Sequence, residues 1–136
     1  MAEILSESSE NYLEVIYELG VYTNVVRLTD VANKMSVSKA SVNKAMGVLK
    51  KAGLVSQQHY GGIELTQAGR KQAQKVMNRH AKIFEFFHNV LGVDFETADK
   101  DACRVEHVIS ETTMEAWSRY VDECLKLGEN EEDIIE

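Results

Sequence analysis

The first apolar positions of the chain follow a helical spacing. After a serine-rich start suited to N-capping, apolar side chains recur at intervals of three and four, at Tyr12, Val15, Ile16 and Leu19. This pattern predicts a first helix that turns one apolar face toward a core. Gly20 is expected to end it, because glycine is the common residue just after a helix.

Two shorter helical patterns follow, separated by a few polar residues. Thr29 can cap a helix that runs to about Met35, and the segment 36–39 then makes a turn. A second helix runs from there to about Ala52, where Gly53 stops it. Two short helices joined by a tight turn are typical of a helix-turn-helix.

The next segment, LVSQQHYGGIELT, changes to a β-rich pattern. Two β-rich runs flank Gly61 and Gly62, which predicts a hairpin. A hairpin directly after a helix-turn-helix is a wing. We therefore expect residues 1–72 to form a winged-helix DNA-binding domain.

The remaining pattern is helical. A long helix extends from Thr66 to Leu91, with Gly69 as its weakest point and Gly92 at its end. Two further helices are expected, one containing the stretch DACRVEHVIS and one over residues 112–127. The fold class is therefore mainly α, with a winged helix-turn-helix followed by an all-helical domain over residues 73–136.

Composition places the chain among globular proteins. A chain of 136 residues with 44% hydrophobic content can bury one ordinary core, or two small cores that share the long helix. No apolar run reaches the length of about eighteen residues that a membrane span needs, and the N-terminus lacks the layout of a secretory signal. We expect a cytoplasmic protein without a membrane partner, whose Cys103 and Cys124 are reduced thiols.

Charge is divided unevenly along the chain. The net charge of -7 alone argues against a nucleic-acid partner. Residues 20–79, however, hold ten basic residues against two acidic ones, a net charge of +8, so the remaining residues carry -15. A basic segment flanked by acidic ones suits a protein with one face toward phosphates and another toward cations or a second copy.

The second helix of the predicted helix-turn-helix has the features of a DNA reader. Its apolar Val42, Met46 and Leu49 point inward by their spacing, which leaves the polar N-terminal residues outside. We expect lysines to neutralise phosphates and shorter polar side chains to reach bases or phosphates. The expected DNA-contact residues are Ser38, Lys39, Ala40, Ser41, Asn43, Lys44, Arg27 and Lys50. The alternative is a merely solvated face of a helical bundle.

The stretch DACRVEHVIS contains three potential metal ligands. Spacings of three and four put Cys103, Glu106 and His107 on one side of a helix. A thiolate, a carboxylate and an imidazole together suit a divalent transition ion. Burying all three without a partner would be costly, which favours a metal site over the alternative that Cys103 is a small buried hydrophobe.

Two more residues are candidates for the same site. Asp99 lies four residues before Cys103 on the same stripe, and it is either a ligand or the acidic start of a helix. His80, on the long helix, is either a fourth ligand or a histidine at a helix interface. An ion bound by ligands from two helices would tie these helices together. Metal binding would then affect the position of the basic segment, which the long helix joins to the site.

In order and spacing, these motifs resemble the iron- and manganese-dependent repressors of the diphtheria toxin repressor type. The resemblance covers nearly the whole chain, through SENYLEVIYEL, LTDVANKMSVSKASVNKAMGVLKKAGLV, YGGIELTQAGR, RHAKIFEFFHNVLGVD and DACRVEHVIS. The stretch ACRVEH is close to the signature of the iron-sensing branch. The family implies a homodimer with winged-helix DNA-binding domains and helical metal-binding and dimerisation domains. Some members continue into a third, SH3-like domain at the point where this sequence stops. We therefore expect the two-domain form here.

The resemblance also implies roles by position. Cys103, Glu106 and His107 match the primary metal ligands on the signature helix, and His80 matches a ligand on the long helix. Glu14 matches a carboxylate ligand on the first helix of the manganese-sensing branch.

Three positions depart from the family pattern. Asn11 stands where the branches carry methionine or aspartate, and its neutral amide is a weak ligand, so the site could be completed by water. Phe84 and Asp99 replace a glutamate and a histidine that build a second metal site in the iron-sensing branch. Glu85 together with Asp99 could build a variant of that second site.

The expected function is a metal-dependent transcriptional repressor of metal-uptake genes, activated by Fe²⁺ or Mn²⁺, that binds a palindromic operator as a homodimer. Cys103 favours iron, whereas Glu14 and the two-domain length favour manganese, and we place iron narrowly first. One alternative is a winged-helix regulator that binds DNA constitutively or responds to oxidation of Cys103. Another is a zinc hydrolase, but no separate general base supports it, and we expect no enzyme.

Overall fold

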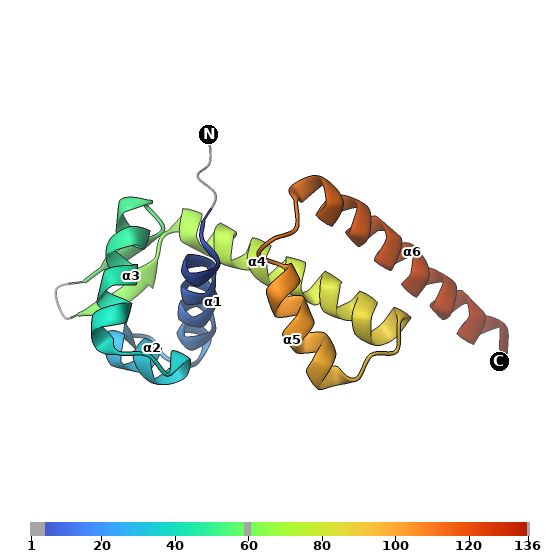
Figure 1. Ribbon diagram of the computed structural model, residues 1–136, viewed down its shortest axis with the longest axis horizontal. Helices are drawn as coiled ribbons and strands as arrows, with labels where there is room; N and C mark the ends of the chain where they lie inside the picture. Colours follow the sequence, from blue (N-terminus) through green and yellow to red (C-terminus); the bar gives the residue numbers. More distant parts are fainter. Residues whose placement is uncertain (1–4, 59–60, 136) are drawn as a thin grey trace. The chain divides into compact units, whose positions relative to one another are not determined.

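A computed structural model describes the backbone of residues 5–58 and 61–135, and the side chains of these residues as far as Leu127. It divides into two compact units, Met1–Val76 and Met77–Glu136, each with its own hydrophobic core (Figure 1). Among the described residues, no helix has both the length and the apolar character that crossing a membrane requires. The structure is mainly α, as predicted.

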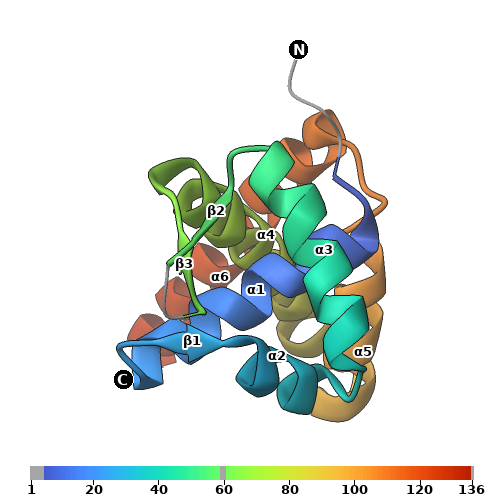
Figure 2. The ribbon, with the colours of Figure 1, turned by 90° about the vertical axis from the view of Figure 1, so that its left-hand side faces the viewer.

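The first unit is a winged helix-turn-helix, which confirms the prediction. Its elements are α1 (Glu7–Tyr22), β1 (Val26–Arg27), α2 (Leu28–Met35), α3 (Lys39–Lys51), β2 (Val55–Gln57), β3 (Gly62–Leu65) and the first part of α4 (Gln67–Glu85). The strands form an antiparallel sheet in the order β1-β3-β2, and α1 packs against α2, α3, β1 and β3 (Figure 2). This packing fixes the helix-turn-helix on the sheet.

The first helix is longer than the sequence predicts. Ser6 caps it, because its side chain accepts the amide hydrogen of Ser9 at 3.1 Å. The prediction that Gly20 ends this helix is wrong, since α1 continues to Tyr22 and closes with a bond from the Thr23 amide to the Leu19 carbonyl at 3.1 Å. Gly20 keeps a negative φ, so it continues the helix instead of acting as a left-handed cap.

The start of α2 also differs from the prediction. Thr29 lies inside this helix and does not cap it, because the helix already begins at Leu28. The capping group is the carboxylate of Asp30, which accepts the amide hydrogen of Arg27 at 3.1 Å. A carboxylate in the first turn also interacts favourably with the helix dipole, which explains why aspartate is used at this position.

The turn between α2 and α3 orients the second helix. Ser36 adopts a left-handed conformation with φ of 56° and ends α2, and Ser38 then caps α3 by accepting the Ser41 amide hydrogen at 3.1 Å. The three side chains predicted to point inward are buried: Val42, Met46 and Leu49. The opposite face of α3 is therefore the exposed one.

The wing is built from one predicted hairpin and one unpredicted strand. Val55 pairs with Leu65 in the hairpin, and His59 and Tyr60 lie outside the described residues. The extra strand, β1, pairs Val26 with Ile63. It is only two residues long, which is too short for a period-two pattern to be recognised in the sequence.

Gly69, predicted as the weakest point of the long helix, lies in its first turn and is required there by packing. A Cβ at this position would lie 1.9 Å from the carbonyl oxygen of Leu54. We expect Gly69→Ala to lower the free energy of unfolding by roughly 1–3 kcal/mol, the usual range for overpacking, as measured by urea denaturation. Gly47→Ala is the matched control, because nothing lies within 4 Å of a Cβ there and α3 should gain about 1 kcal/mol. Equal stability changes in the two variants would contradict this explanation.

The second unit contains the rest of α4, the π-helical segment η1 (Phe86–Val90), α5 (Phe95–Val105) and α6 (Glu111–Ile135). The sequence predicts an α-helix to Leu91, but its last turn is π-helical. Phe86 and Phe87 both contact the ring of Trp117 on α6, with centroids 5.1 and 5.8 Å apart. Gly92 then adopts a φ of 76° and ends the segment, as predicted.

The core of this unit brings α4, α5 and α6 together. Ile83 on α4, Ala102 on α5 and Met114 on α6 are buried against one another. Asp94 caps α5 by accepting the amide hydrogen of Thr97 at 3.1 Å. The buried Ala102 places one face of α5 in the same core as Ile83 of α4.

Candidate metal centre and DNA-reading helix

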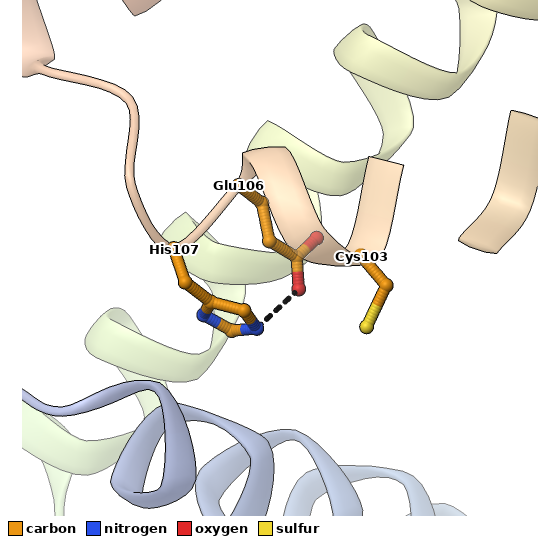
Figure 3. A group of neighbouring side chains, drawn as sticks. All are labelled: Cys103, Glu106 and His107. Carbon is orange, nitrogen blue, oxygen red and sulfur yellow. Dashed lines mark ion pairs between the residues drawn. The ribbon is translucent and has the colours of Figure 1, made fainter. Parts of the chain in front are cut away.

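The structure brings together the three residues of the DACRVEHVIS stretch that the sequence marks as ligands. One ligand atom from each of Cys103, Glu106 and His107 lies within 4.8 Å of the other two. Figure 3 shows the Glu106 carboxylate between the thiol of Cys103 and the ring of His107. Among the residues that the structure describes, these three, here called the ligand group, form the one such cluster of His, Cys, Asp and Glu side chains.

The backbone under the ligand group is not the continuous helix that we predict from spacing. α5 ends at Val105, and Glu106 and His107 lie in the turn that follows. Glu106 still has helical angles, with φ of -58° and ψ of -26°, and its amide donates to the carbonyl of Ala102 at 3.0 Å. The side chains therefore keep nearly the directions that a helix would give them, which is why the grouping is right although the helix boundary is wrong.

Glu106 is the centre of the ligand group. Its side chain is fully buried, with 0% exposure. Oε2 lies 2.8 Å from Nδ1 of His80, and Oε1 lies 3.1 Å from Nε2 of His107. The contact between Oε1 and His107 is not a hydrogen bond, and Oε1 has no hydrogen-bond partner among the described residues. A buried carboxylate oxygen left without a hydrogen bond is costly, unless a cation compensates its charge.

His80 lies beside the ligand group and links it to Asp99. Its Nδ1 faces Glu106 and its Nε2 lies 2.8 Å from Oδ1 of Asp99. The hydrogen bond with Glu106, together with the bond to Asp99 and the charges of both carboxylates, raises the pKa of His80 to about 9, although burial acts to lower it. Because only a neutral imidazole binds metal, an ion at Nδ1 would have to displace the proton there.

These side chains fit a divalent transition ion. The donors are a thiol, a carboxylate and an imidazole, with a second imidazole in contact with the carboxylate. Such a mixed set of sulfur, oxygen and nitrogen suits Fe²⁺, Mn²⁺, Co²⁺ or Zn²⁺. The buried Oε1 of Glu106 supports a cation site independently of the donor types. A bound cation would take the place of the hydrogen bond that this oxygen lacks.

Two of the other predicted ligands belong to the first unit. Asn11 and Glu14 are half-buried on α1, in the first unit. Phe84 joins an aromatic group with His88 and Phe95, at centroid distances of 5.2 and 5.0 Å. Phe84 stands at the sequence position where the family resemblance gives a second-site glutamate, and its ring offers no ligand atom.

Glu85 does not join Asp99 in the structure. Its Oε2 lies 3.8 Å from the ammonium of Lys82, which also contacts Asp122 on α6. Glu85 is thus part of a charged group that connects α4 to α6. The variant second site built from Glu85 and Asp99 finds no support in the described residues.

The exposed face of α3 carries the predicted DNA-contact residues. All of the following are exposed: Ser38, Lys39, Ala40, Ser41, Asn43, Lys44, Lys50 and, on β1, Arg27. Basic or short polar side chains at the N-terminus of an exposed helix suit the major groove of DNA. Lys50 also donates a hydrogen bond to Gln57 of β2, so it connects α3 to the wing.

Sequence reasoning missed the pairing of His80 with Asp99. The two residues are nineteen positions apart and lie on different helices, so no periodicity relates them. The signal available in the sequence was weaker, namely that Asp99 and the ligand group share one stripe of α5. That stripe faces α4, where His80 lies.

Comparisons with known proteins agree with this arrangement. Residues 4–63 match the iron dependent repressor N-terminal DNA binding domain, and residues 66–126 match the iron dependent repressor metal binding and dimerisation domain. The chain is 33% identical over 112 residues to an uncharacterized HTH-type transcriptional regulator of Methanocaldococcus jannaschii, covering 82% of this chain and 90% of that protein. It is 37% identical over 111 residues to the transcriptional regulator MntR of Escherichia coli, covering 82% of this chain and 71% of that one.

Solved structures show the same fold. The manganese regulator SloR is 28% identical and superposes with a TM-score of 0.75, covering 84% of this chain and 53% of that chain. ScaR with bound Zn²⁺ is 30% identical with the same TM-score, and again 84% of this chain and 53% of that chain are covered. This chain therefore spans about half the length of these solved chains.

Proposed function

The chain belongs to the iron-dependent repressor family of DNA-binding transcriptional regulators, which are not enzymes, and from this premise we propose that it is a metal-activated repressor of metal-uptake genes. The single observation that carries the metal dependence is the ligand group around the buried, incompletely hydrogen-bonded carboxylate of Glu106. The exposed, basic N-terminal part of α3 supports DNA binding. Because a regulator of this family binds DNA, we place its activity in the cytoplasm.

We assign Cys103, Glu106, His107 and His80 as the residues that would hold the ion. When bound, the ion supplies positive charge that neutralises the buried carboxylate and ties α4 to the end of α5. From the first unit, the family resemblance adds Glu14, with Asn11 as a weaker ligand.

In our proposal, α4 is the element that couples metal binding to DNA binding. This helix carries His80 near its C-terminal end, and its first turn directly follows the last strand of the wing. Fixing His80 therefore restrains the same helix whose beginning packs in the winged helix-turn-helix, where Gly69 lies against Leu54. In our proposal the ion limits the positions that α3 can take.

We propose that the regulator acts as a homodimer on a palindromic operator. Two copies of α3 can enter successive major grooves only when they stand about 34 Å apart, one turn of DNA. The second unit exposes large apolar side chains that suit contact with a second copy. They are Val90, Leu91, Phe95, Val108, Tyr120 and Leu127.

A selection experiment tests this function. A pool of random double-stranded DNA is incubated with the protein in Fe²⁺ under anaerobic conditions, in Mn²⁺, or in chelator, at fixed salt. We expect a palindromic sequence to be enriched with metal and not with chelator. Equal enrichment in chelator would reject metal activation and favour the constitutive alternative. The hydrogen bonds of His80 with Glu106 and Asp99 would then hold α4 against α5 without an ion.

The choice between iron and manganese depends on whether the sulfur of Cys103 binds the ion. A thiolate ligand favours Fe²⁺ over the harder Mn²⁺, so we place Fe²⁺ first. With Co²⁺ as a probe, we expect a thiolate charge-transfer band in the near-ultraviolet that Cys103→Ser removes. Cys124→Ser is the matched control and should keep the band, because Cys124 lies outside the ligand group. No band in the unmodified protein would move the preference to manganese.

A further inference from the structure

We propose that Asp99 is a positioning residue that holds His80 in the tautomer and orientation needed to bind the ion through Nδ1. The inference rests on the proposed function, since it concerns how one ligand of that site is oriented. Two distances carry it: Nε2 of His80 lies 2.8 Å from Asp99 Oδ1, and Nδ1 lies 2.8 Å from Glu106 Oε2.

The two carboxylates meet opposite sides of one imidazole ring. Glu106 is fully buried and belongs to the ligand group, so the nitrogen that faces it, Nδ1, is the one directed toward the ion. A neutral imidazole carries one N–H and one lone pair. With the lone pair on Nδ1, the hydrogen is on Nε2, where the Asp99 carboxylate can accept it.

Asp99 is not itself placed to bind the same ion. Its oxygen contacts Nε2, so the ring of His80 stands between this carboxylate and the ligand group. The Asp99 side chain is 54% exposed, whereas that of Glu106 is 0% exposed. A carboxylate that accepts the N–H of a metal-binding histidine fixes the ring and raises its basicity as a ligand.

A double-mutant cycle separates positioning from direct ligation. We expect Asp99→Ala to weaken Mn²⁺ binding roughly 10-fold, within the 10- to 100-fold usual for groups that orient a metal ligand. In the His80→Ala background, the same substitution should have no effect, because Asp99 would act only through His80. An equal loss in both backgrounds would show that Asp99 binds the ion directly and would overturn the inference.

A spectroscopic measurement keeps the proposal testable if His80→Ala binds too weakly to titrate. In the Zn²⁺-loaded protein, nitrogen NMR of the His80 ring should show a protonated Nε2 and a metal-shifted Nδ1. Asp99→Ala should speed the exchange of the Nε2 proton, and Asp99→Asn, whose amide oxygen still accepts a hydrogen bond, should restore most of the affinity. A protonated Nδ1 in the Zn²⁺-loaded protein would overturn the inference.

Two comparisons distinguish this inference from the proposed function itself. Asp101→Ala removes another exposed carboxylate two positions along α5 and should leave Mn²⁺ affinity unchanged, so a general charge effect would be detected. If the unmodified protein bound no Mn²⁺, the proposed function would fail. If it bound Mn²⁺ and Asp99→Ala bound it equally well, only the positioning role would fail.

Discussion

Replacing Glu106 by glutamine is expected to abolish metal-dependent DNA binding. Glutamine keeps the volume of this fully buried side chain and removes the charge that both His80 and His107 contact. We expect metal affinity to fall by more than about 100-fold, beyond the 10- to 100-fold effect of groups that only orient ligands. The measurement is isothermal titration with Mn²⁺, together with the rise in melting temperature that Mn²⁺ causes.

The controls for Glu106→Gln address folding and charge. Glu106→Asp keeps the charge on a shorter side chain and should bind Mn²⁺ with an affinity between those of the unmodified protein and the glutamine variant. Glu115→Gln makes the same chemical change at an exposed position of α6 and should behave like the unmodified protein. Circular dichroism checks that each variant is helical. A glutamine variant that is folded and binds Mn²⁺ normally would remove Glu106 from the site.

Placing a carboxylate at the start of α3 is expected to remove DNA binding without loss of stability. Ala40 is exposed in the first turn of α3, after the Ser38 cap. In Ala40→Glu, the new charge would face phosphates, and like-charge contacts cost several kcal/mol, or about 100-fold or more in affinity. The same charge interacts favourably with the helix N-terminus, so the melting temperature should not fall.

Ala68→Glu is the matched control for this prediction. Ala68 is also an exposed alanine in the first turn of a helix, α4, and the substitution changes the net charge equally. Fluorescence anisotropy with the selected DNA, at fixed salt, measures both variants. Equal losses of affinity would mean that overall charge matters rather than the position of α3. An unchanged affinity in Ala40→Glu would place the DNA on another surface.

The elements that the sequence predicts well have strong local signals. The turn around Ser36 and Ser38 and the inward face of α3 follow from capping residues and from apolar spacing, and both are present in the structure. Gly20 and Thr29 misled the prediction, because a glycine without a positive φ can remain helical and because Asp30, not Thr29, satisfies the free amide at the start of α2. Local propensity alone does not decide between such neighbours.

The ligand group could be predicted for a similar reason. Spacings of three and four bring Cys103, Glu106 and His107 together whether or not the helix continues to the last of them. The burial of Glu106 and the contacts of His80 depend on how α4 packs against α5, which no short-range pattern reports. The requirement for glycine at position 69 could not be predicted from the sequence either, because it depends on the close approach of the Leu54 backbone.

The central claim is that metal in the ligand group and DNA on α3 each strengthen the binding of the other. Linkage requires that the two effects be equal, and couplings of this kind are typically 5- to 150-fold. The most direct measurement is the Mn²⁺ or Fe²⁺ dissociation constant with and without the selected DNA, beside the DNA dissociation constant with and without the same ion. We predict the same factor, at least about 10-fold, in both titrations. An ion that binds with identical affinity to the free and the DNA-bound protein would contradict the claim.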